Sequence, residues 1–360
     1  EKEKEPGLRL FSIPAGLPQS LETVNLVAAI PEFVDGIKSA VKLDYDVIHA
    51  HYWMSGLAAL ALIELVPIPL VSTMHTLGLV KERVLSVPEQ LIQQRVLGER
   101  RVLRASAKVV ASTPAEEAEL QWLYEVKRQQ VCVISPGVDS SLFNPAEKGT
   151  SREKLGIPAD QQAVLFVGRL DPIKGLETLI EAIGLINQQP RTPSHLYVVG
   201  GELDPNGTLV GELGQKLMEF ARKIGMADLI HFLGQRKQSD LPTFYNAADI
   251  VVLPSHYESF GLVALEAMSC GRPVVVSKVG GLAELVEDME TGLHAAVGDA
   301  ADFAQKMRRI FDDPSLASSL SRNARRYALE NSWEECARSI ETLYEIVAGH
   351  KVDHGNQNAT

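Results

Sequence analysis

The chain of 360 residues has few cysteines, no long apolar run and no excess of basic residues. Its three cysteines, Cys132, Cys270 and Cys336, cannot all pair, and none stands in a C-x-x-C spacing. A disulfide framework and a structural zinc site are therefore not expected, whereas a reducing cytoplasm is. No apolar run reaches the roughly 18 residues of a membrane span. The net charge of −11 disfavours binding to a nucleic-acid backbone or an anionic membrane.

The sequence does contain short apolar runs that alternate with longer amphipathic segments, and its length predicts two domains. Several runs are apolar on consecutive residues, which favours parallel strands buried on both faces and a doubly wound α/β sheet. In the first part we expect strands over 8–13, 46–50, 69–73, 108–112 and 131–134, with helices over 23–43, 57–65, 89–104 and 115–124.

This rhythm breaks over residues 135–157, where prolines, glycines and the absence of a period predict a linker. A second series follows, with strands expected over 164–168, 195–199, 230–233, 249–253, 273–277 and 293–296, and helices over 176–188, 213–224, 261–270, 302–311, 314–330 and 333–348. We therefore expect one Rossmann-like domain over 1–140, a second over 141–332, a helix over 333–349 that crosses back to the first, and a frayed tail over 350–360.

The first motif is F-V-G-R-L-D-P-I-K-G-L-E, residues 166–177, which starts on a predicted strand and ends on a predicted helix. Gly168 is expected to let the chain turn sharply. Arg169 and Lys174 then follow the carboxyl end of the strand, where ligands of open α/β sheets bind. Two cations there suit a diphosphate whose charge grows as a bond to it breaks. The alternative is a solvated loop with two surface cations.

The second motif runs from Pro254 to Pro273 and holds two glutamates eight residues apart, Glu258 and Glu266. The amides of Gly261, Leu262 and Val263 would open a helix, and the positive end of its dipole suits a phosphate. We expect Glu258 to hold hydroxyls of a sugar, unless it only caps the helix. Glu266 is expected to accept the hydroxyls of a ribose, because a charge among apolar neighbours needs a partner.

These motifs, G-R-L-D-P-I-K-G, S-H-Y-E-S-F-G-L-V-A-L-E-A-M-S-C-G-R-P-V-V and V-G-G-L-A-E, resemble those of the retaining glycosyltransferases of family 4, which have the GT-B fold. The resemblance extends from about residue 46 to 333. It implies two Rossmann-like domains facing a cleft. It also implies a donor site made of Gly168, Arg169, Lys174, Glu258, Phe260, Gly261, Leu262, Val263 and Glu266.

In the first domain, D-V-I-H-A-H-Y-W-M-S-G and S-T-M-H-T-L-G-L-V-K resemble the acceptor half of two subgroups. These are the sucrose-phosphate synthases and the enzymes that glycosylate inositol phosphate in mycothiol synthesis. The resemblance implies a phosphorylated acceptor, with His75 beside the reacting sugar and Tyr52, Thr76, Lys81 and Arg95 around the acceptor phosphate. The other reading of Lys81 and Arg95 is a solvated helix face. His49 and His51 are expected to be satisfied core groups.

The resemblance further implies transfer of a hexosyl group from a nucleotide diphosphate sugar with retention of configuration. UDP-glucose is favoured over UDP-N-acetylglucosamine. Catalysis is expected to involve His75, Arg169, Lys174 and Glu258. No second carboxylate is aimed at the reaction centre, so a front-face attack is expected rather than the double displacement of retaining glycosidases. Because no D-x-D motif stands at a strand end, we expect neither a metal nor a further cofactor.

One feature departs from the family pattern. Members usually begin with a strand and a glycine-rich loop, yet residues 1–45 hold only Gly7, Gly16 and Gly36, well separated. We therefore expect the first domain to be incomplete here by about 60 to 80 residues, the size of part of a βαβαβ half. Two alternatives stay open: a GT-B nucleotide-sugar epimerase, and a truncated, inactive nucleotide-sugar-binding protein. The oligomeric state is left open as well.

Overall fold

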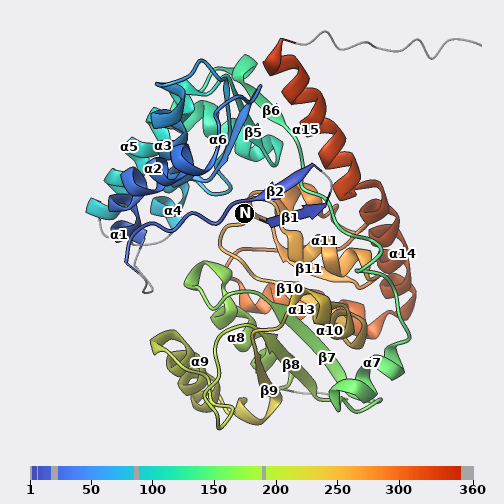
Figure 1. The fold of residues 1–360 in the computed structure, drawn as a ribbon. Coiled ribbons are helices and arrows are strands. Elements are labelled where there is room, and N and C mark those ends of the chain that lie inside the picture. The colour runs from blue at the N-terminus through green and yellow to red at the C-terminus, as the bar shows by residue number, and fades with distance from the viewer. Residues whose placement is uncertain (1, 6, 18–22, 85–88, 189–191, 350–360) are drawn as a thin grey trace, which may run out of the picture. The chain divides into compact units, whose positions relative to one another are not determined.

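The computed structural model describes residues 2–5, 7–17, 23–84, 89–188 and 192–349. Contacts divide the chain into two compact units, residues 1–134 with 338–360, and residues 135–337 (Figure 1). The expected tail over 350–360 lies outside the described residues. Within the described part, no helix is both long and apolar enough to span a membrane.

Unit 1, residues 1–134 and 338–360, is built on a four-stranded parallel sheet in the order β3-β4-β5-β6. Its strands are β3 (Ile48–His51), β4 (Leu70–Thr73), β5 (Lys108–Ala111) and β6 (Val131–Val133). Its helices are α1 (Thr23–Ala28), α2 (Ile30–Ala40), α3 (Trp53–Ile63), α4 (Gly78–Val84), α5 (Glu89–Ala105) and α6 (Pro114–Tyr124), with a 3₁₀ turn η1 (Arg128–Gln130).

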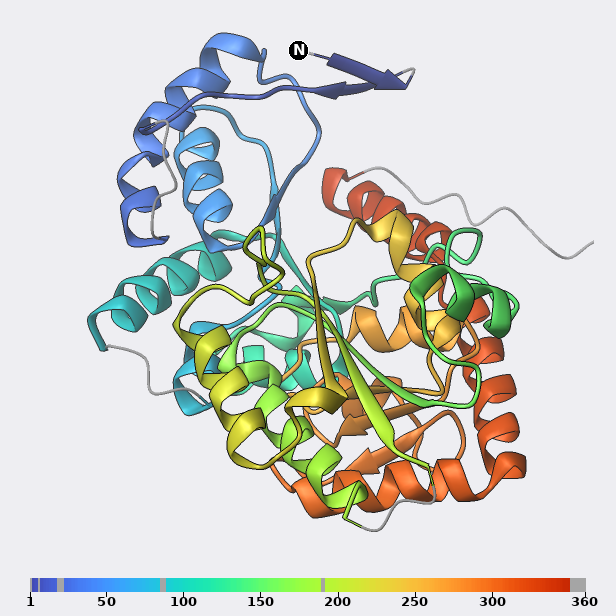
Figure 2. The same cartoon turned by 90° about the horizontal axis from the view of Figure 1, so that it is seen from below.

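The strand expected over 8–13 is not part of this sheet. Instead, β2 (Leu8–Leu10) pairs antiparallel with β1 (Lys2–Glu5) in a separate two-stranded sheet (Figure 2). The side chains of Leu8 and Leu10 are exposed. The prediction failed because a short alternation of apolar and polar residues also fits a hairpin with no buried face.

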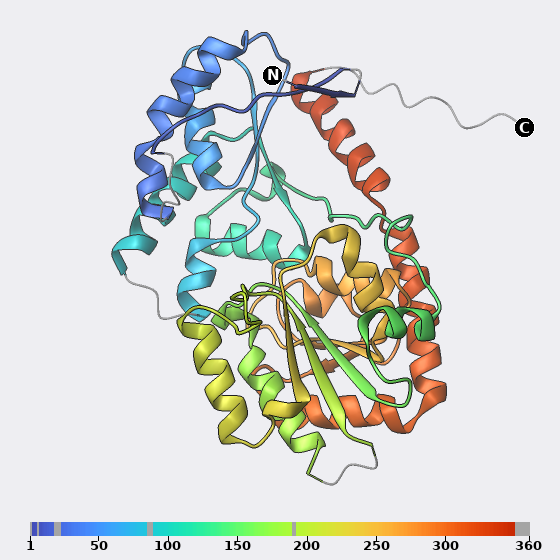
Figure 3. The same cartoon turned by 60° about the horizontal axis from the view of Figure 1, so that its bottom comes forward.

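Unit 2, residues 135–337, contains a six-stranded sheet in the order β12-β11-β10-β7-β8-β9, and all of its strand pairs are parallel (Figure 3). Its strands are β7 (Gln162–Val167), β8 (Ser194–Val199), β9 (Ile230–Gly234), β10 (Ile250–Leu253), β11 (Val274–Ser277) and β12 (Leu293–Ala295). Its helices are α7 (Lys148–Leu155), α8 (Leu176–Ile186), α9 (Glu212–Lys223), α10 (Leu241–Ala247), α11 (Leu262–Ser269), α12 (Leu282–Leu285), α13 (Ala300–Asp312) and α14 (Pro314–Glu330), with 3₁₀ turns η2 (Pro172–Lys174), η3 (Ala227–Leu229) and η4 (Gln238–Asp240).

The core of unit 2 lies on both faces of this sheet. Along β7, Ala163 and Leu165 belong to one apolar cluster, and Val164 and Phe166 to the other. Side chains alternate between the faces of a strand, and each face here is covered by helices. This explains why the strands are apolar at consecutive positions.

Local signals explain where several helices begin. Thr113 caps α6 by accepting a hydrogen bond from the N–H of Glu116, and Pro114 occupies the first helical position. Asp313 and Pro314 start α14 in the same way, and the Asp313 carboxylate accepts from two amides. The segment expected to be a linker contains one of the unpredicted helices, α7, which Glu147 caps and which ends at Gly156 in the left-handed region.

The last helix, α15 (Trp333–Ala348), belongs to unit 1 from Arg338 onward. Its Leu343 is buried in a cluster with Val71 of β4 and Val110 of β5, and Tyr344 packs against the same cluster. The final turns of the described chain therefore cover one face of the sheet in unit 1.

Candidate active site

The strand order of unit 2 reverses between β7 and β10. From β7 the chain proceeds to β8 and β9 on one side, whereas β10, β11 and β12 follow on the other. In open α/β sheets, the crevice at the carboxyl ends of strands at such a switch point is where ligands bind. The loop after β7 carries Arg169 and Lys174, and the loop after β10 carries Glu258. The two motifs found in the sequence therefore meet at the switch point.

Lys174 and Glu258 form an ion pair there. The Lys174 ammonium lies 2.5 Å from the Glu258 carboxylate, and each side chain is about one-fifth exposed. A backbone hydrogen bond joins the two loops, because the N–H of His256 donates to the Ile173 carbonyl at 2.7 Å. Within the loop after β7, Asp171 caps the turn η2 through the N–H of Ile173. Because this ion pair is partly exposed and an ammonium has three N–H donors, Lys174 can also contact an incoming anion.

Two glycines allow these loops to approach closely. Gly175 has φ of 65°, and a Cβ there would lie 2.1 Å from the Pro254 carbonyl oxygen. At Gly281 a Cβ would lie 2.3 Å from the Ser259 carbonyl oxygen, while the Gly281 N–H donates to the Glu258 carbonyl at 2.8 Å. Any side chain at Gly175 or Gly281 would push the neighbouring backbone segment away. The V-G-G-L-A-E segment thus supports the loop that presents Glu258.

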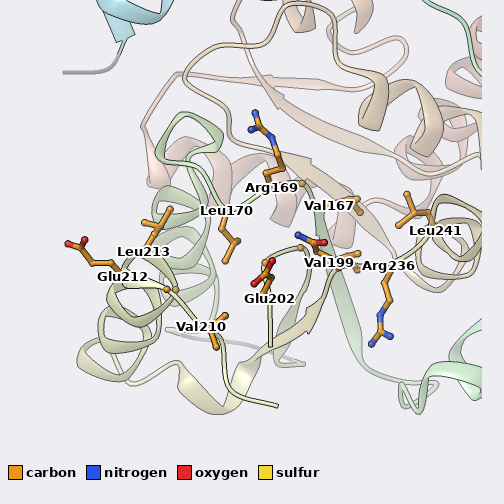
Figure 4. A pocket seen from close by; sticks show the side chains of 16 residues that line it. Val167, Arg169, Leu170, Val199, Glu202, Val210, Glu212, Leu213, Arg236 and Leu241 are labelled. Atoms are coloured by element: carbon orange, nitrogen blue, oxygen red, sulfur yellow. The ribbon is translucent and has the colours of Figure 1, made fainter. Parts of the chain in front are cut away.

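A cavity of about 690 Å³ opens at the carboxyl ends of β7, β8 and β9 (Figure 4). This volume is within the range typical of small-molecule sites. Apolar side chains, glycine backbone and charged side chains line this cavity. The lining residues are Val167, Gly168, Arg169, Leu170, Val199, Gly200, Gly201, Glu202, Val210, Gly211, Glu212, Leu213, Gly214, Gln235, Arg236 and Leu241. The Arg169 side chain is 77% exposed and lies 3.8 Å from the Asp171 carboxylate.

Sequence reasoning missed most of this lining. It expected Gly168 to turn the chain sharply, yet Gly168 does not have positive φ, and its N–H extends the sheet by donating to the Val199 carbonyl at 3.0 Å. The close approach is made by Gly200, where a Cβ would lie 1.8 Å from the Gly168 carbonyl oxygen. The Gly-Gly pair directly after β8 is the signal that would have located this cavity.

Glu266 has a partner within unit 2. Its carboxylate, nine-tenths buried, accepts a hydrogen bond from the Tyr245 hydroxyl at 2.7 Å. Burial raises the pKa of Glu266, and the hydrogen bonds from Tyr245 and Gln238 act against that rise. The protein itself therefore supplies part of the hydrogen bonding that the sequence led us to expect from a ribose. Binding of a ribose by Glu266 stays a prediction.

The start of α11 has the expected form. Ala264 and Leu265 donate to the Gly261 carbonyl, so the amides of Gly261, Leu262 and Val263 precede the first helical hydrogen bonds. Phe260 is buried in the apolar core of unit 2. Its structural role is therefore packing beneath the loop that holds Glu258.

In unit 1, three of the residues predicted to bind the acceptor, Tyr52, His75 and Thr76, follow the carboxyl ends of β3 and β4. Tyr52 follows β3 with φ of 74°, and His75 follows β4 with φ of 62°. Residues other than glycine rarely adopt this conformation, which costs on the order of 1–3 kcal/mol and is concentrated at functional sites. The Tyr52 N–H donates to the Thr73 carbonyl at 2.8 Å, which ties the two strained ends together.

Arg95 contacts two of the other four predicted acceptor residues, Thr76 and Tyr52. Its Nη2 donates to the Thr76 carbonyl at 2.6 Å and to the Thr76 hydroxyl at 2.8 Å, and its guanidinium lies over the Tyr52 ring at 5.3 Å. Arg95 is 8% exposed, so the alternative prediction that it lies on a solvated helix face is wrong. Lys81 stands on α4 and is half-buried.

A buried carboxylate that sequence reasoning missed holds Arg95 in place. Glu99, one turn along α5, accepts from Arg95 Nε at 2.7 Å and from the Gly78 N–H at 3.1 Å. Its other hydrogen bond comes from the Tyr124 hydroxyl, which also accepts from the Leu79 N–H. Glu99 is completely buried, and three donors satisfy it through four hydrogen bonds. The loop after β4 is therefore fixed through one carboxylate.

The two histidines of β3 differ in their surroundings. His49 is a satisfied, half-buried group: its ring nitrogens lie 2.6 Å from the Tyr344 hydroxyl and 2.8 Å from the Thr73 hydroxyl. His51 does not fit the same expectation, because it is exposed and its Nδ1 lies 3.0 Å from Nε2 of His75. The sequence prediction was wrong for His51 because β3 ends there, at the open edge of the sheet.

Comparison with known proteins identifies the class of this fold and site. Residues 147–327 match the model of "glycosyl transferases group 1", and residues 1–137 match that of the "glycosyl transferase 4-like domain". The chain therefore belongs to the group 1 glycosyltransferases, enzymes of the family 4 type with the GT-B fold, as the sequence motifs predicted.

A curated relative and two solved structures are similar to this chain over most of its length. The chain is 36% identical over 352 residues to the D-inositol 3-phosphate glycosyltransferase of Thermobispora bispora, covering 95% of this chain and 81% of the relative. The sucrose-phosphate synthase structure from Thermosynechococcus elongatus is 34% identical with a TM-score of 0.86, covering 96% and 85% of the two chains. A structure of Anabaena HepE in complex with UDP is 25% identical with a TM-score of 0.72, covering 90% and 84%.

Proposed function

We propose that this glycosyltransferase moves a hexosyl group, glucose in the first instance, from a UDP-sugar to a phosphorylated sugar or cyclitol. The observation that carries the donor half is the Lys174–Glu258 ion pair at the switch point of unit 2. Support comes from the adjoining cavity of about 690 Å³ and from the similarity to a structure that holds UDP.

We propose that the diphosphate of the donor lies against Lys174, Arg169 and the amides that open α11, with the base in the cavity. Lys174 can then contact the diphosphate and Glu258 together, and the Glu258 carboxylate, which can accept several hydrogen bonds, can also bind sugar hydroxyls. Cations and amides aimed at the leaving group stabilise it most when its bond breaks. The similar sucrose-phosphate synthase supports glucose as the sugar.

For the acceptor, the supporting observation is the contact of Arg95 with Thr76 and Tyr52 in unit 1. A guanidinium held by a buried carboxylate loses little side-chain entropy when it binds, and a hydroxyl beside it is a second donor to phosphate. The names of two similar proteins support a phosphorylated acceptor, since they contain the words D-inositol 3-phosphate and sucrose-phosphate. A sucrose-phosphate synthase-like reaction with fructose 6-phosphate is our first choice.

The proposed reaction is a front-face displacement with retention. The bond from the anomeric carbon to the diphosphate oxygen breaks, a bond to the acceptor oxygen forms on the same face, and the acceptor proton passes to the departing diphosphate. His75 stands beside the reacting sugar. No metal or further cofactor takes part in the proposal, and the reaction is placed in the cytoplasm, which suits three unpaired cysteines.

Titration with nucleotides tests the donor assignment. UDP is expected to bind more tightly than GDP or ADP in isothermal calorimetry, and EDTA is expected to leave that affinity unchanged. Equal affinity for the three nucleotides would remove UDP from the proposal, and the absence of binding at millimolar concentration would remove the nucleotide site itself.

A further inference from the structure

The carboxyl edge of the sheet in unit 1 presents a pair of imidazoles rather than a single one. His51 ends β3 and His75 follows β4, the neighbouring strand, in which His51 is paired with Thr73. Both side chains are exposed, so the pair faces whatever binds at this edge. Nδ1 of His51 lies 3.0 Å from Nε2 of His75, and the two rings are inclined by only 18°.

This geometry requires one shared proton. Two neutral imidazoles bond through facing nitrogens only if one nitrogen carries hydrogen and the other a lone pair. Although both side chains are exposed, the protein around them removes part of the water from each ring, and this partial desolvation lowers the pKa of His51 and of His75, which favours the neutral rings near neutral pH. Protonation of both rings would place two N–H groups against each other and break the contact. The position of the proton on one ring therefore decides its position on the other.

Neighbouring groups hold the His51 ring in this orientation. The ring of His49 stacks on it with centroids 4.3 Å apart, and His49 is itself fixed by the hydroxyls of Tyr344 and Thr73. A chain of contacts thus runs from α15 through β3 to His75. Because a histidine that acts on a ligand usually has its other nitrogen fixed by a second group, this chain has the form of an orienting device.

We propose that His51 is a positioning residue that fixes the ring orientation and the tautomer of His75 for the transfer reaction. In this tautomer His75 carries its hydrogen on Nε2, and this N–H donates a hydrogen bond to Nδ1 of His51. Nδ1 of His75 then holds the lone pair. This assignment gives both rings the Nε2–H form that imidazole side chains intrinsically prefer, whereas the reverse gives both the less favoured form. The inference rests on the proposed function for its effect on turnover, but not for the tautomer.

Nitrogen NMR of the full chain with ¹⁵N-labelled histidine tests the tautomer without any substrate. At neutral pH, Nε2 of His75 is expected to show the shift of a protonated nitrogen and Nδ1 that of an unprotonated one. In His51→Ala the two nitrogens are expected to move toward averaged values. A proton on Nδ1 of His75 in the unaltered protein, or an unchanged spectrum in His51→Ala, would overturn the proposal.

Kinetics test the consequence. His51→Ala is expected to lower kcat by about 10- to 100-fold, by analogy with the loss found when a group that orients a metal-bound histidine is removed. Both KM values are expected to change by less than about threefold, and His51→Asn, whose side-chain oxygen can accept in place of Nδ1, is expected to recover part of kcat. A kcat within about twofold of the unaltered protein would overturn the role, since that is the effect of ordinary surface substitutions.

A matched control exists in unit 2, where Nδ1 of His195 lies 2.9 Å from Nε2 of His231 and the rings are stacked. His231→Ala removes a similar histidine contact and is expected to leave kcat unchanged. If the unaltered protein transfers no sugar, the proposed function fails while the NMR result still decides the tautomer. If His51→Ala does not fold, the spectrum of the unaltered protein and the kcat of His51→Asn decide the proposal.

Discussion

The ion pair between Lys174 and Glu258 makes a testable prediction about electrostatic coupling. The change to make is Lys174→Met, which keeps the length of the apolar stem and removes the charge. In the unaltered protein Lys174 lies 2.5 Å from Glu258. When the diphosphate binds, Lys174 is expected to contact both anions, so the carboxylate and phosphate oxygens come within about 5 Å of each other, the sum of two hydrogen-bond lengths.

The magnitude follows from these distances. Loss of a charged contact to phosphate costs roughly 1.5–3 kcal/mol, and the Glu258 carboxylate that remains repels the diphosphate. At about 5 Å and an effective dielectric constant near 20, that repulsion is about 3 kcal/mol per charge pair. Since both side chains are one-fifth exposed, we reduce it to about 1–2 kcal/mol. Together these contributions amount to about 2.5–5 kcal/mol, so Lys174→Met is expected to weaken UDP binding by about 70- to 5,000-fold.

The double variant separates the two contributions. Glu258→Gln alone is expected to leave UDP affinity unchanged or to strengthen it, because Lys174 no longer has a competing anion. Added to Lys174→Met, it is expected to restore about 5- to 30-fold of the lost affinity, the equivalent of that 1–2 kcal/mol. Calorimetry at one fixed, low ionic strength measures all four proteins. If Lys174→Met and the double variant bind UDP equally, Glu258 does not face the diphosphate and the reasoning is refuted.

Three further predictions concern single residues. Lys81→Ala is expected to raise KM for a phosphorylated acceptor by about 10- to 150-fold while UDP affinity stays constant, and equal KM values in both proteins would remove Lys81 from the site. Glu116 is buried and burial raises its pKa from 4.5 to about 7, so its charged form is disfavoured in the folded state and stability falls as pH rises through that interval. Glu116→Gln is expected to remove about 3 kcal/mol of this pH-dependent loss of unfolding free energy. Urea unfolding at pH 4.5 and pH 8 measures the loss, and an equal loss in both proteins would contradict the prediction. Tyr245→Phe leaves the Glu266 carboxylate without its 2.7 Å donor and is expected to destabilise unit 2 by about 1–3 kcal/mol, whereas an unchanged midpoint of thermal unfolding would show that the bond contributes nothing.

The fold of unit 2 was predictable from the sequence because each strand is a short apolar run with a clear end. The helices over 314–330 and 333–348 have the predicted bounds, since a cap or a proline marks a start and the apolar period marks the length. Short helices were missed, as at α4 and α10, because seven residues are too few to show a period. The strand over 8–13 was misplaced because sequence does not give the pairing partner.

The candidate site was predictable in part, most directly where its residues follow a strand. Lys174 and Glu258 were both placed at strand ends, but their ion pair joins residues 84 positions apart and depends on β7 and β10 being neighbours. Tyr245, Glu99 and His51 were missed because each acts through a contact that only the folded chain creates. A buried carboxylate on an amphipathic helix, such as Glu99, has no sequence signature that separates it from a surface one.

Product analysis tests the central proposal most directly. The protein is incubated with UDP-glucose and, in separate reactions, fructose 6-phosphate, D-inositol 3-phosphate and the two unphosphorylated acceptors, and the products are examined by mass spectrometry and proton NMR. The proposal predicts UDP release coupled to a glucosylated phosphate ester from at least one phosphorylated acceptor, with the α configuration retained and little product from the unphosphorylated forms. An inverted anomeric centre, an epimerised nucleotide sugar, or equal transfer to phosphorylated and plain acceptors would contradict it.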